Sequence, residues 1–596
     1  MKRTLTSLCL WALWSGSQGA SVPNEVDKLI KKVNPKVNLG IVVVDLTSGE
    51  TLYRRNANHL FIPASNMKLF SEAAALMVLG PDYHFKNQLS ISSGKIQNGV
   101  LHGNIYLQLS GDPSFSRENL KKLVSSLKDL HINTIQGNLY IDSSLAVVDA
   151  YPPGWLAADL SYSYGAPNAP VIIDANRLTV TVNPGARSGD PAMVEVDDGG
   201  AAITVNNQVT TKTSANECGV GFSLDQDNHL IARGCVGVDQ WAVQQRMAIK
   251  NPLAYTQGII QNDLAQANIQ LNGQIQLGKT PTGTVLIATN YSKALSELMA
   301  DTLKPSDNLY ADSLYLHAAA KLNGSPVNWN EAEPFIKKFL QAQTGIDFKN
   351  AVFADGSGLS RHSLVTPEQT LSLLQFLYQR FPLSYEYISA LPVSGRDGTL
   401  QKRFRTPTQQ GFVRAKTGTM TGVNSLSGYL YTSNGHTLGF AMYINRRPGK
   451  ATGPGRPVLD ALCSYFLRLN PVSSRLTQVF SAHKRMNFQL NPTQAERQKI
   501  HQAKWRRLES AVRIALKGQS VNIVYRGNEL IVNDHQSDAG KVWTSLQFVF
   551  KKYPFAVILS SQTLAINQSS NPMLLWLKTT NATNHLQRTW TIKEAA

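Results

Sequence analysis

Three short motifs follow one another along the chain: Ser65-Asn-Met-Lys68, Ser306-Asp-Asn308 and Lys416-Thr-Gly418. Each motif alone is common in long proteins and says little. Together, in this order, they constrain the fold strongly, because widely separated segments must then meet at one site. The first motif opens a helical segment at 69–79, and the last lies in a strand-like segment. The alternative is a helix N-cap, a loop and a turn with no shared role, which requires three coincidences.

Ser65 and Lys68 have the spacing of a nucleophile and its base. Residues i and i+3 share one helix face, so the Lys68 amine can reach the Ser65 hydroxyl. A neutral serine is a weak nucleophile and needs a base to accept its proton. Lys68 can do this only with a neutral amine, and burial together with a second cation, Lys416, would lower its pKa. A helix that begins at Ser65 would also offer backbone N–H groups to an oxyanion.

The second and third motifs supply the remaining chemistry. Ser306 and Asn308 can both face a cleft from a loop. We expect Ser306 to relay a proton to the leaving nitrogen, and Asn308 to hold Lys68 and a substrate amide.

The Lys416 strand can bind the substrate. Lys416, Thr417 and Thr419 offer a cation and hydroxyls to a terminal carboxylate. The strand through Gly418 can also pair with an extended peptide.

The first twenty residues have the pattern of a secretory signal peptide. A basic start at 1–3 precedes an apolar run from Leu5 to Trp14 and a small, polar stretch that ends at Ala20. This run is too short for a stable membrane anchor. The alternative is a buried first helix. No later apolar run is long enough to span a membrane, so we expect a protein exported to the periplasm or cell envelope.

The length of the chain and the changing pattern of strand-like and helical segments indicate several domains. A chain of 596 residues exceeds one ordinary core, and its 42% hydrophobic and 16% charged residues are typical of a folded, soluble protein. Strand-like segments at 39–54 and 411–444, with helical segments between them, predict an α+β domain with helices on an antiparallel sheet. The predicted division is a signal peptide (1–20), a discontinuous domain (21–83 and 270–471), an inserted, mainly β region of two subdomains (84–269) and an α/β appendage (472–596).

The cysteines indicate one local disulfide. Cys218 and Cys235 lie close together in the sequence, each next to a glycine, and export permits oxidation. Cys463 lies in an apolar helical stretch and is expected to be a buried thiol. The sequence has no zinc-ligand spacing, so neither a metal site nor a cofactor is predicted.

Positive charge is concentrated near the C-terminus. Residues 471–596 contain 17 Lys and Arg and 6 Asp and Glu, a net charge of +11 out of +18 for the chain. Nucleic acid is an unsuitable partner for an exported protein, whereas anionic envelope polymers or lipid head groups fit. A basic surface without a dedicated partner is the alternative.

The sequence resembles the low-molecular-mass class C penicillin-binding proteins, which are D-alanyl-D-alanine carboxypeptidase/endopeptidases of the bacterial envelope. The resemblance covers roughly residues 25–470. It rests on the three motifs, their long separation and five blocks of sequence. These blocks are Pro63-Ala-Ser-Asn-Met-Lys-Leu-Phe, Leu109-Ser-Gly-Asp-Pro-Ser-Phe, Tyr164-Gly-Ala-Pro, Asp355-Gly-Ser-Gly-Leu-Ser-Arg and Val413-Arg-Ala-Lys-Thr-Gly-Thr.

The resemblance implies a β-lactamase/transpeptidase-like fold, acylation of Ser65 by peptidoglycan stem peptides and covalent inhibition by β-lactams. It also implies a subsite for the diaminopimelate side chain of the stem, at Asp159, Tyr164 and Arg361. Some relatives have a glutamine shortly after the Lys-Thr-Gly motif, where this chain has Thr421. The appendage after 472 resembles no part of the family.

The sequence is also compatible with two other functions. A serine β-lactamase needs a base for the deacylating water, and Glu331 and Glu333 lie between the second and third motifs without the expected loop pattern. An inactive peptidoglycan-binding protein would keep the fold without turnover. The sequence does not separate carboxypeptidase from endopeptidase activity.

Overall fold

The structure is a computed structural model that describes residues 22–469, except 34–37, 95, 146–149, 202, 217 and 447–454, together with five strands within 521–594. The chain divides into two compact units, 1–471 and 472–596. The predicted signal peptide and much of the predicted appendage at 472–596 lie outside the described residues. Within the described residues, no helix is both long and apolar enough to cross a membrane.

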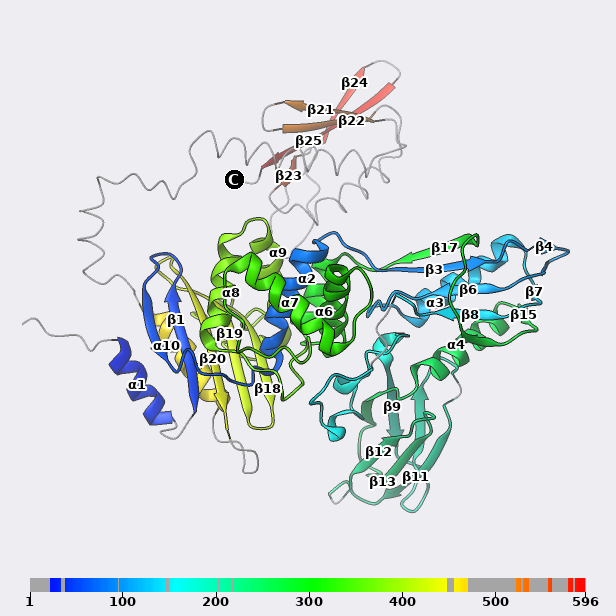
Figure 1. Cartoon of the computed structure of the whole chain (residues 1–596), viewed down its shortest axis with the longest axis horizontal. Helices are drawn as coiled ribbons and strands as arrows, with labels where there is room; N and C mark the ends of the chain where they lie inside the picture. Colours follow the sequence, from blue (N-terminus) through cyan, green and yellow to red (C-terminus); the bar gives the residue numbers. More distant parts are fainter. Residues whose placement is uncertain are drawn as a thin grey trace, which may run out of the picture. The chain divides into compact units, whose positions relative to one another are not determined.

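A five-stranded antiparallel sheet forms the centre of the discontinuous domain (Figure 1). Its strand order is β18-β19-β20-β1-β2, so the N-terminal hairpin pairs with the last strands of the domain. The strands are β1 (Leu39–Asp45), β2 (Thr51–Arg55), β18 (Val413–Met420), β19 (Val423–Tyr431) and β20 (Thr437–Asn445).

Helices cover both faces of this sheet, which explains why its strands are nearly continuous apolar runs. Val42 and Val44 of β1 belong to the core on one face, and Ile41 and Val43 to the core on the other. The core on the first face contains residues of α2 (Lys68–Leu79), α5 (Leu295–Leu303), α6 (Asn308–Asn323), α7 (Trp329–Thr344), α8 (Pro367–Gln379) and α9 (Leu383–Ala390), of which α8 packs directly on the sheet. The core on the second face contains residues of α1 (Val22–Val33) and α10 (Gly455–Arg468). The predicted α+β class is confirmed.

The inserted region contains two groups of sheets that share one hydrophobic core. The first group is formed by β3 (Lys86–Ile91), β4 (Ile96–Gln97), β5 (Val100–Leu101), β6 (Ile105–Gln108), β7 (Thr134–Ile135), β8 (Leu139–Asp142), β15 (Gln270–Leu271), β16 (Ile275–Leu277) and β17 (Val285–Tyr291). The second is formed by β9 (Arg177–Asn183), β10 (Met193–Asp197), β11 (Val205–Lys212), β12 (Val220–Leu224), β13 (Leu230–Gly237) and β14 (Val243–Ala248).

The inserted region differs from the prediction in two respects. Strand β17 pairs with β3, and β16 with β8, so the region runs to Tyr291 and not to residue 269. Its described residues also contain two α-helices, α3 (Arg117–Ser125) and α4 (Pro252–Gln266). Asn251 caps α4 by accepting a hydrogen bond from the Ala254 N–H at 3.0 Å, and Pro252 is the first residue of the helix.

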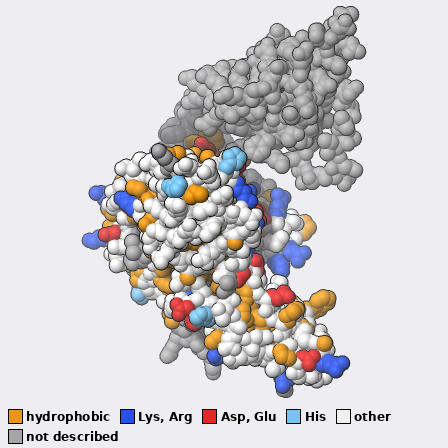
Figure 2. Space-filling view, turned by 90° about the vertical axis from the view of Figure 1, so that its right-hand side faces the viewer, with side chains coloured by type: hydrophobic (Ala, Val, Ile, Leu, Met, Phe, Trp, Pro, Cys, Tyr) orange, Lys and Arg blue, Asp and Glu red, His pale blue; other side chains and the backbone are white. Residues whose placement is uncertain are grey.

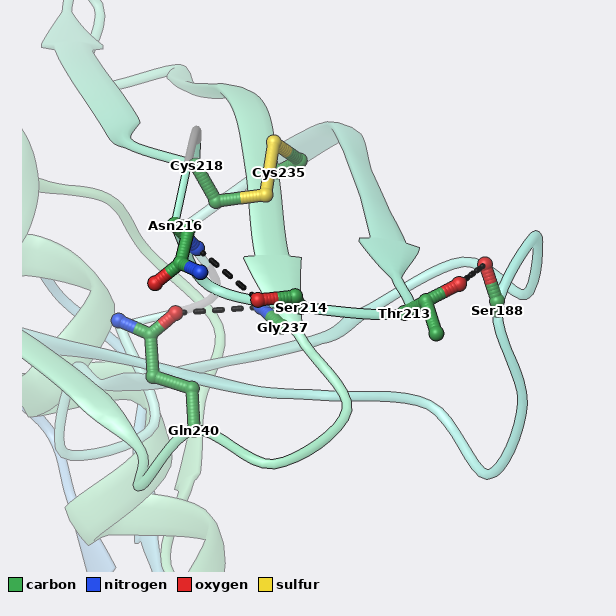
Figure 3. The surroundings of a disulfide bond; sticks show 8 residues. All are labelled: Ser188, Thr213, Ser214, Asn216, Cys218, Cys235, Gly237 and Gln240. Atoms are coloured by element: carbon green, nitrogen blue, oxygen red, sulfur yellow. Dashed lines mark hydrogen bonds between the residues drawn. A yellow bond between two sulfur atoms is a disulfide. The ribbon is translucent and has the colours of Figure 1, made fainter.

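Cys218 and Cys235 form the predicted disulfide (Figure 3). It joins the segment before β12 to strand β13 of the inserted region. Figure 2 faces the inserted region and shows hydrophobic side chains among basic and acidic ones. Met193, Val238 and Trp241 are exposed hydrophobic residues of this region. Cys463 is a free, buried thiol in α10, and burial raises its pKa.

The second unit contains an antiparallel sheet of order β21-β22-β25-β23, with β24 also paired to β25. Its strands are β21 (Val521–Arg526), β22 (Glu529–Asp534), β23 (Ala556–Leu559), β24 (Leu577–Ala582) and β25 (His585–Glu594).

Candidate active site

Ser65 and Lys68 lie on one continuous helical segment. A 3-10 turn at Ala64–Met67 leads directly into α2, whose first residue is Lys68. The Lys68 amine is 3.2 Å from the Ser65 hydroxyl oxygen. Ser65 is half-buried and Lys68 is fully buried, so the hydroxyl borders the surface while the amine lies behind it.

Two further groups from distant segments hold the Lys68 amine. It donates to the Asn308 side-chain oxygen at 2.6 Å and to the Ser357 backbone carbonyl at 2.8 Å. Asn308 is the first residue of α6, which packs against α2. With the Ser65 hydroxyl, these two acceptors fix the direction of the amine.

Lys416 joins the third motif to the second. Its buried amine donates to the Ser306 hydroxyl at 2.8 Å and to the Thr417 carbonyl at 3.0 Å. Strand β18, which carries Lys416, is an edge of the sheet. The Thr417 hydroxyl donates to Thr399 at 2.8 Å, and Thr419 is exposed further along the strand.

Glycines allow two backbones to approach the Ser65 turn. A Cβ on Gly418 would lie 2.0 Å from the Ser425 hydroxyl oxygen and 2.8 Å from the Pro63 carbonyl oxygen. A Cβ on Gly358 would lie 1.9 Å from the Ala64 carbonyl oxygen. Side chains at these positions would push the strand or the loop away from the serine, so glycine is required at both positions.

Burial tunes both lysines. It lowers the pKa of Lys68 to about 8, against the opposing attraction of the acidic side chains Asp312, Asp355, Asp307 and Glu72. Burial, and then repulsion from Lys68, holds the pKa of Lys416 well below its usual value. The expected lowering on Lys68 is thus present, but burial causes it, and the repulsion between the two cations acts on Lys416.

The loop 355–363 lies next to Lys68, and Arg361 was its one residue predicted as part of the site. Asp355 is fully buried and accepts hydrogen bonds from the Gly358 and Ser360 N–H groups at 2.9 and 2.7 Å. The Trp155 indole of the inserted region also donates to Asp355, at 3.0 Å. These bonds shape the loop that presents the Ser357 carbonyl to Lys68. The Asp-Gly-Ser-Gly pattern at 355–358 marks this loop in the sequence, but it does not indicate that the Ser357 carbonyl contacts Lys68.

Asp159 and Tyr164 lie together, and Arg361 lies on a different segment. The Tyr164 hydroxyl donates to Asp159 at 3.0 Å, and the Tyr164 carbonyl accepts from the Asn308 amide at 2.8 Å. The Arg361 guanidinium donates to the Thr421 carbonyl at 3.1 and 3.2 Å. Asn308 therefore links the Asp159–Tyr164 pair to Lys68.

Glu331 and Glu333 are engaged in other contacts. Glu331 completes the cap of α7 by accepting from the Asn328 N–H at 2.9 Å. Glu333 accepts from Lys337 at 3.3 Å and from the Phe353 N–H at 3.2 Å. Both have structural partners, so neither supports a β-lactamase-type base. Among the described residues, no group of three or more His, Cys, Asp or Glu side chains is arranged to hold a metal ion.

Comparison with known proteins identifies the family. The sequence profile of the D-Ala-D-Ala carboxypeptidase 3 (S13) family matches residues 22–461. The D-alanyl-D-alanine carboxypeptidase DacB of Haemophilus influenzae is 32% identical over 72% of this chain and 89% of its own length. A D-alanyl-D-alanine carboxypeptidase of Actinomadura sp. strain R39 is 29% identical over 73% of this chain and 83% of its own.

Solved structures agree with the sequence comparison. The crystal structure of penicillin binding protein 4 from H. influenzae has a TM-score of 0.69 and 30% identity, and the match covers 74% of this chain and 99% of that one. A structure of the same protein complexed with a β-lactam has a TM-score of 0.64. The chain thus belongs to the D-Ala-D-Ala carboxypeptidase 3 (S13) family, as its three motifs and sequence blocks predict.

Proposed function

We propose that the protein is a serine D-alanyl-D-alanine carboxypeptidase/endopeptidase that acts on peptidoglycan stem peptides through an acyl-enzyme on Ser65. One observation carries this proposal: the Lys68 amine contacts both Ser65 and Asn308, and the Lys416 amine contacts Ser306. Family membership supports the same reaction.

Acylation begins with the neutral form of Lys68. Its amine accepts the Ser65 proton while the hydroxyl oxygen attacks the carbonyl carbon of the penultimate D-alanine. The negative charge that develops on the carbonyl oxygen meets the N–H groups at the start of the Ser65 turn. A buried amine with a pKa near 8 holds a substantial neutral fraction at neutral pH, so no large free-energy cost precedes the attack.

The acyl-enzyme forms when the bond to the terminal residue breaks. Ser306 passes a proton to the departing amine and regains one from Lys416, which it contacts at 2.8 Å. The proton that Lys68 took from Ser65 makes up this loss, so Lys68 is neutral again. Water then attacks the acyl carbon, and Lys68 accepts the proton of water and returns it to Ser65, which leaves as the hydroxyl. The shortened stem peptide is released.

Substrate binding uses the free edge of β18. The Ala415 N–H pairs with the Pro392 carbonyl at 3.1 Å, so the edge available to an extended peptide begins after this residue. Lys416, Thr417 and Thr419 would bind the terminal carboxylate at this edge. Asp159 and Tyr164, and Arg361 from the loop, are our candidates for the diaminopimelate side chain.

Product analysis tests the proposed function. Purified protein is incubated with stem pentapeptides and with cross-linked muropeptides, and the products are separated by mass. Release of D-alanine indicates carboxypeptidase activity, and cleavage of the cross-link indicates endopeptidase activity. Rapid turnover of penicillin would favour a β-lactamase. The absence of both products, together with the absence of penicillin labelling, would favour an inactive binding protein.

We also propose that the protein works in the periplasm after removal of residues 1–20. The apolar run at 5–14 supports export. A mature N-terminus near residue 21, determined by mass spectrometry of the protein from the envelope fraction, would support this location. Retention of Met1 would contradict it.

The basic C-terminal unit is our candidate for attachment to anionic envelope surface. Its net charge of +11 predicts binding that weakens as salt rises. Truncation after residue 471 is expected to abolish salt-sensitive binding to sacculi and to leave penicillin acylation unchanged. Binding is measured by co-sedimentation across a salt series. Equal binding by the truncated and full-length proteins would remove the idea.

A further inference from the structure

The middle residue of the second motif pairs with an arginine from the inserted region. Arg177, the first residue of β9, donates from both terminal nitrogens to the two carboxylate oxygens of Asp307 at 2.5 and 2.7 Å. The two side chains are only 8% and 15% exposed. A two-point pair of this kind fixes direction as well as distance, so Asp307 has one position relative to β9.

Asp307 controls the two functional residues beside it. It is the N-cap of α6, where its side chain accepts from the Tyr310 N–H at 3.3 Å. Ser306 has a φ of +68°, a backbone conformation that non-glycine residues adopt only when their surroundings impose it. Asn308 follows directly and holds Lys68. A displaced Asp307 would therefore move both Ser306 and Asn308.

Arg177 also holds the segment that carries Tyr164. Its Nε donates to the Ser163 carbonyl at 2.8 Å, while the Asn308 amide donates to the next carbonyl, that of Tyr164, at 2.8 Å. The Arg177 guanidinium and the Asn308 amide thus donate to adjacent carbonyls of one short turn, Ser163–Gly165. The contacts close a ring from Arg177 through Asp307, Asn308 and the turn back to Arg177.

Electrostatics keep the pair charged. Burial raises the pKa of Asp307, but the hydrogen bonds and positive charge of Arg177 outweigh burial and hold that pKa below its usual value. Without the guanidinium, the buried carboxylate would lose its salt bridge and keep the weaker attraction of Lys68, which favours its protonation or displacement.

We infer that Arg177 is a positioning residue: its clamp on Asp307 and Ser163 aligns the proton-relay motif with the substrate-side turn, so that acylation and recognition of the stem peptide depend on one side chain of the inserted region. The inference rests on the proposed function, because it assigns that reaction's alignment to a group that does not touch the reacting atoms.

Acylation kinetics provide the first test. Arg177→Ala is expected to lower the second-order rate constant for labelling by fluorescent penicillin by about 10²-fold, the effect of misplacing catalytic groups by about 1 Å. The final labelling per folded molecule should stay unchanged. Arg177→Lys keeps the charge but not the two-point geometry and should lose about 10-fold. The double variant Arg177→Ala/Asp307→Asn should label no more slowly than the slower of the single variants Arg177→Ala and Asp307→Asn, because the two side chains act as one unit.

Arg403→Ala is the matched control. Arg403 is 7% exposed, and its guanidinium donates to Asp460 of α10 inside the discontinuous domain. It should label at the wild-type rate once normalised to folded protein. A wild-type rate with reduced final labelling in Arg177→Ala and Arg177→Lys would mean that Arg177 serves folding alone, and would overturn the inference.

Hydrogen exchange gives a test that needs no activity. Backbone amides of 162–165 and 305–309 should lose protection together in Arg177→Lys and keep it in Arg403→Ala. Unchanged protection of either segment would overturn the inference, even if the protein labelled slowly. If wild-type protein took no penicillin label, the proposed function would fail while this readout still decided the role of Arg177.

Discussion

Replacing Ser65 with alanine is expected to lower D-alanine release by about 10⁴-fold or more and to abolish covalent labelling by penicillin. The substitution removes the only atom of this side chain that can form an ester, while its neighbours Lys68 and Asn308 keep their positions. Release is measured from a stem pentapeptide, and labelling by gel fluorescence. The melting temperature should stay close to that of the wild type, because Ser65 is half-buried and small.

Ser389→Ala is the control for this variant. Ser389 is an exposed serine on α9 whose hydroxyl donates to a backbone carbonyl of its own helix at 3.0 Å. It should leave both release and labelling unchanged. Persistent labelling of Ser65→Ala would assign the nucleophile to a different residue.

Replacing Lys68 with arginine is expected to slow acylation by about 10³-fold, within the range for loss of a general base. Arginine retains the positive charge but cannot be deprotonated in a protein, so it can pair with Asn308 without accepting the Ser65 proton. Lys68→Met, which removes the charge at similar length, should be similarly slow. If arginine restored most of the rate that methionine loses, Lys68 would act through its charge and not as a base.

The pH dependence of the wild type checks the same role. Only the neutral amine accepts the proton, so the rate of penicillin acylation should rise with pH through about 8, the pKa of buried Lys68, and then level off. The arginine variant should lack this rise. A wild-type rate that is flat or falls between pH 6 and 9, while the protein stays folded, would contradict the assignment.

Local chemistry was predictable from the sequence because it depends on short spacing. The spacing of Ser65 and Lys68 sets their contact, and nearly continuous apolar runs predict the buried strands β1, β19 and β20. The predicted disulfide likewise joins cysteines only 17 residues apart.

Partners that meet only in the folded chain were not predictable. Nothing in the sequence around Ser357 shows that its carbonyl lies under Lys68, which is 289 residues away. The same holds for Arg177 and Asp307, 130 residues apart. The end of the inserted region was misplaced for this reason, since the pairings of β15 with β7, β16 with β8 and β17 with β3 show that residues 270–291 belong to it.

Mass spectrometry of the wild-type protein tests the central claim most directly. In separate reactions, the protein is incubated with penicillin, or with a stem pentapeptide followed by a rapid acid quench, and is then digested for peptide mapping. We expect one covalent acyl group per molecule in each reaction, carried by the peptide that contains Ser65 and absent from Ser65→Ala. An acyl group on another residue, or none with either reagent, would contradict it.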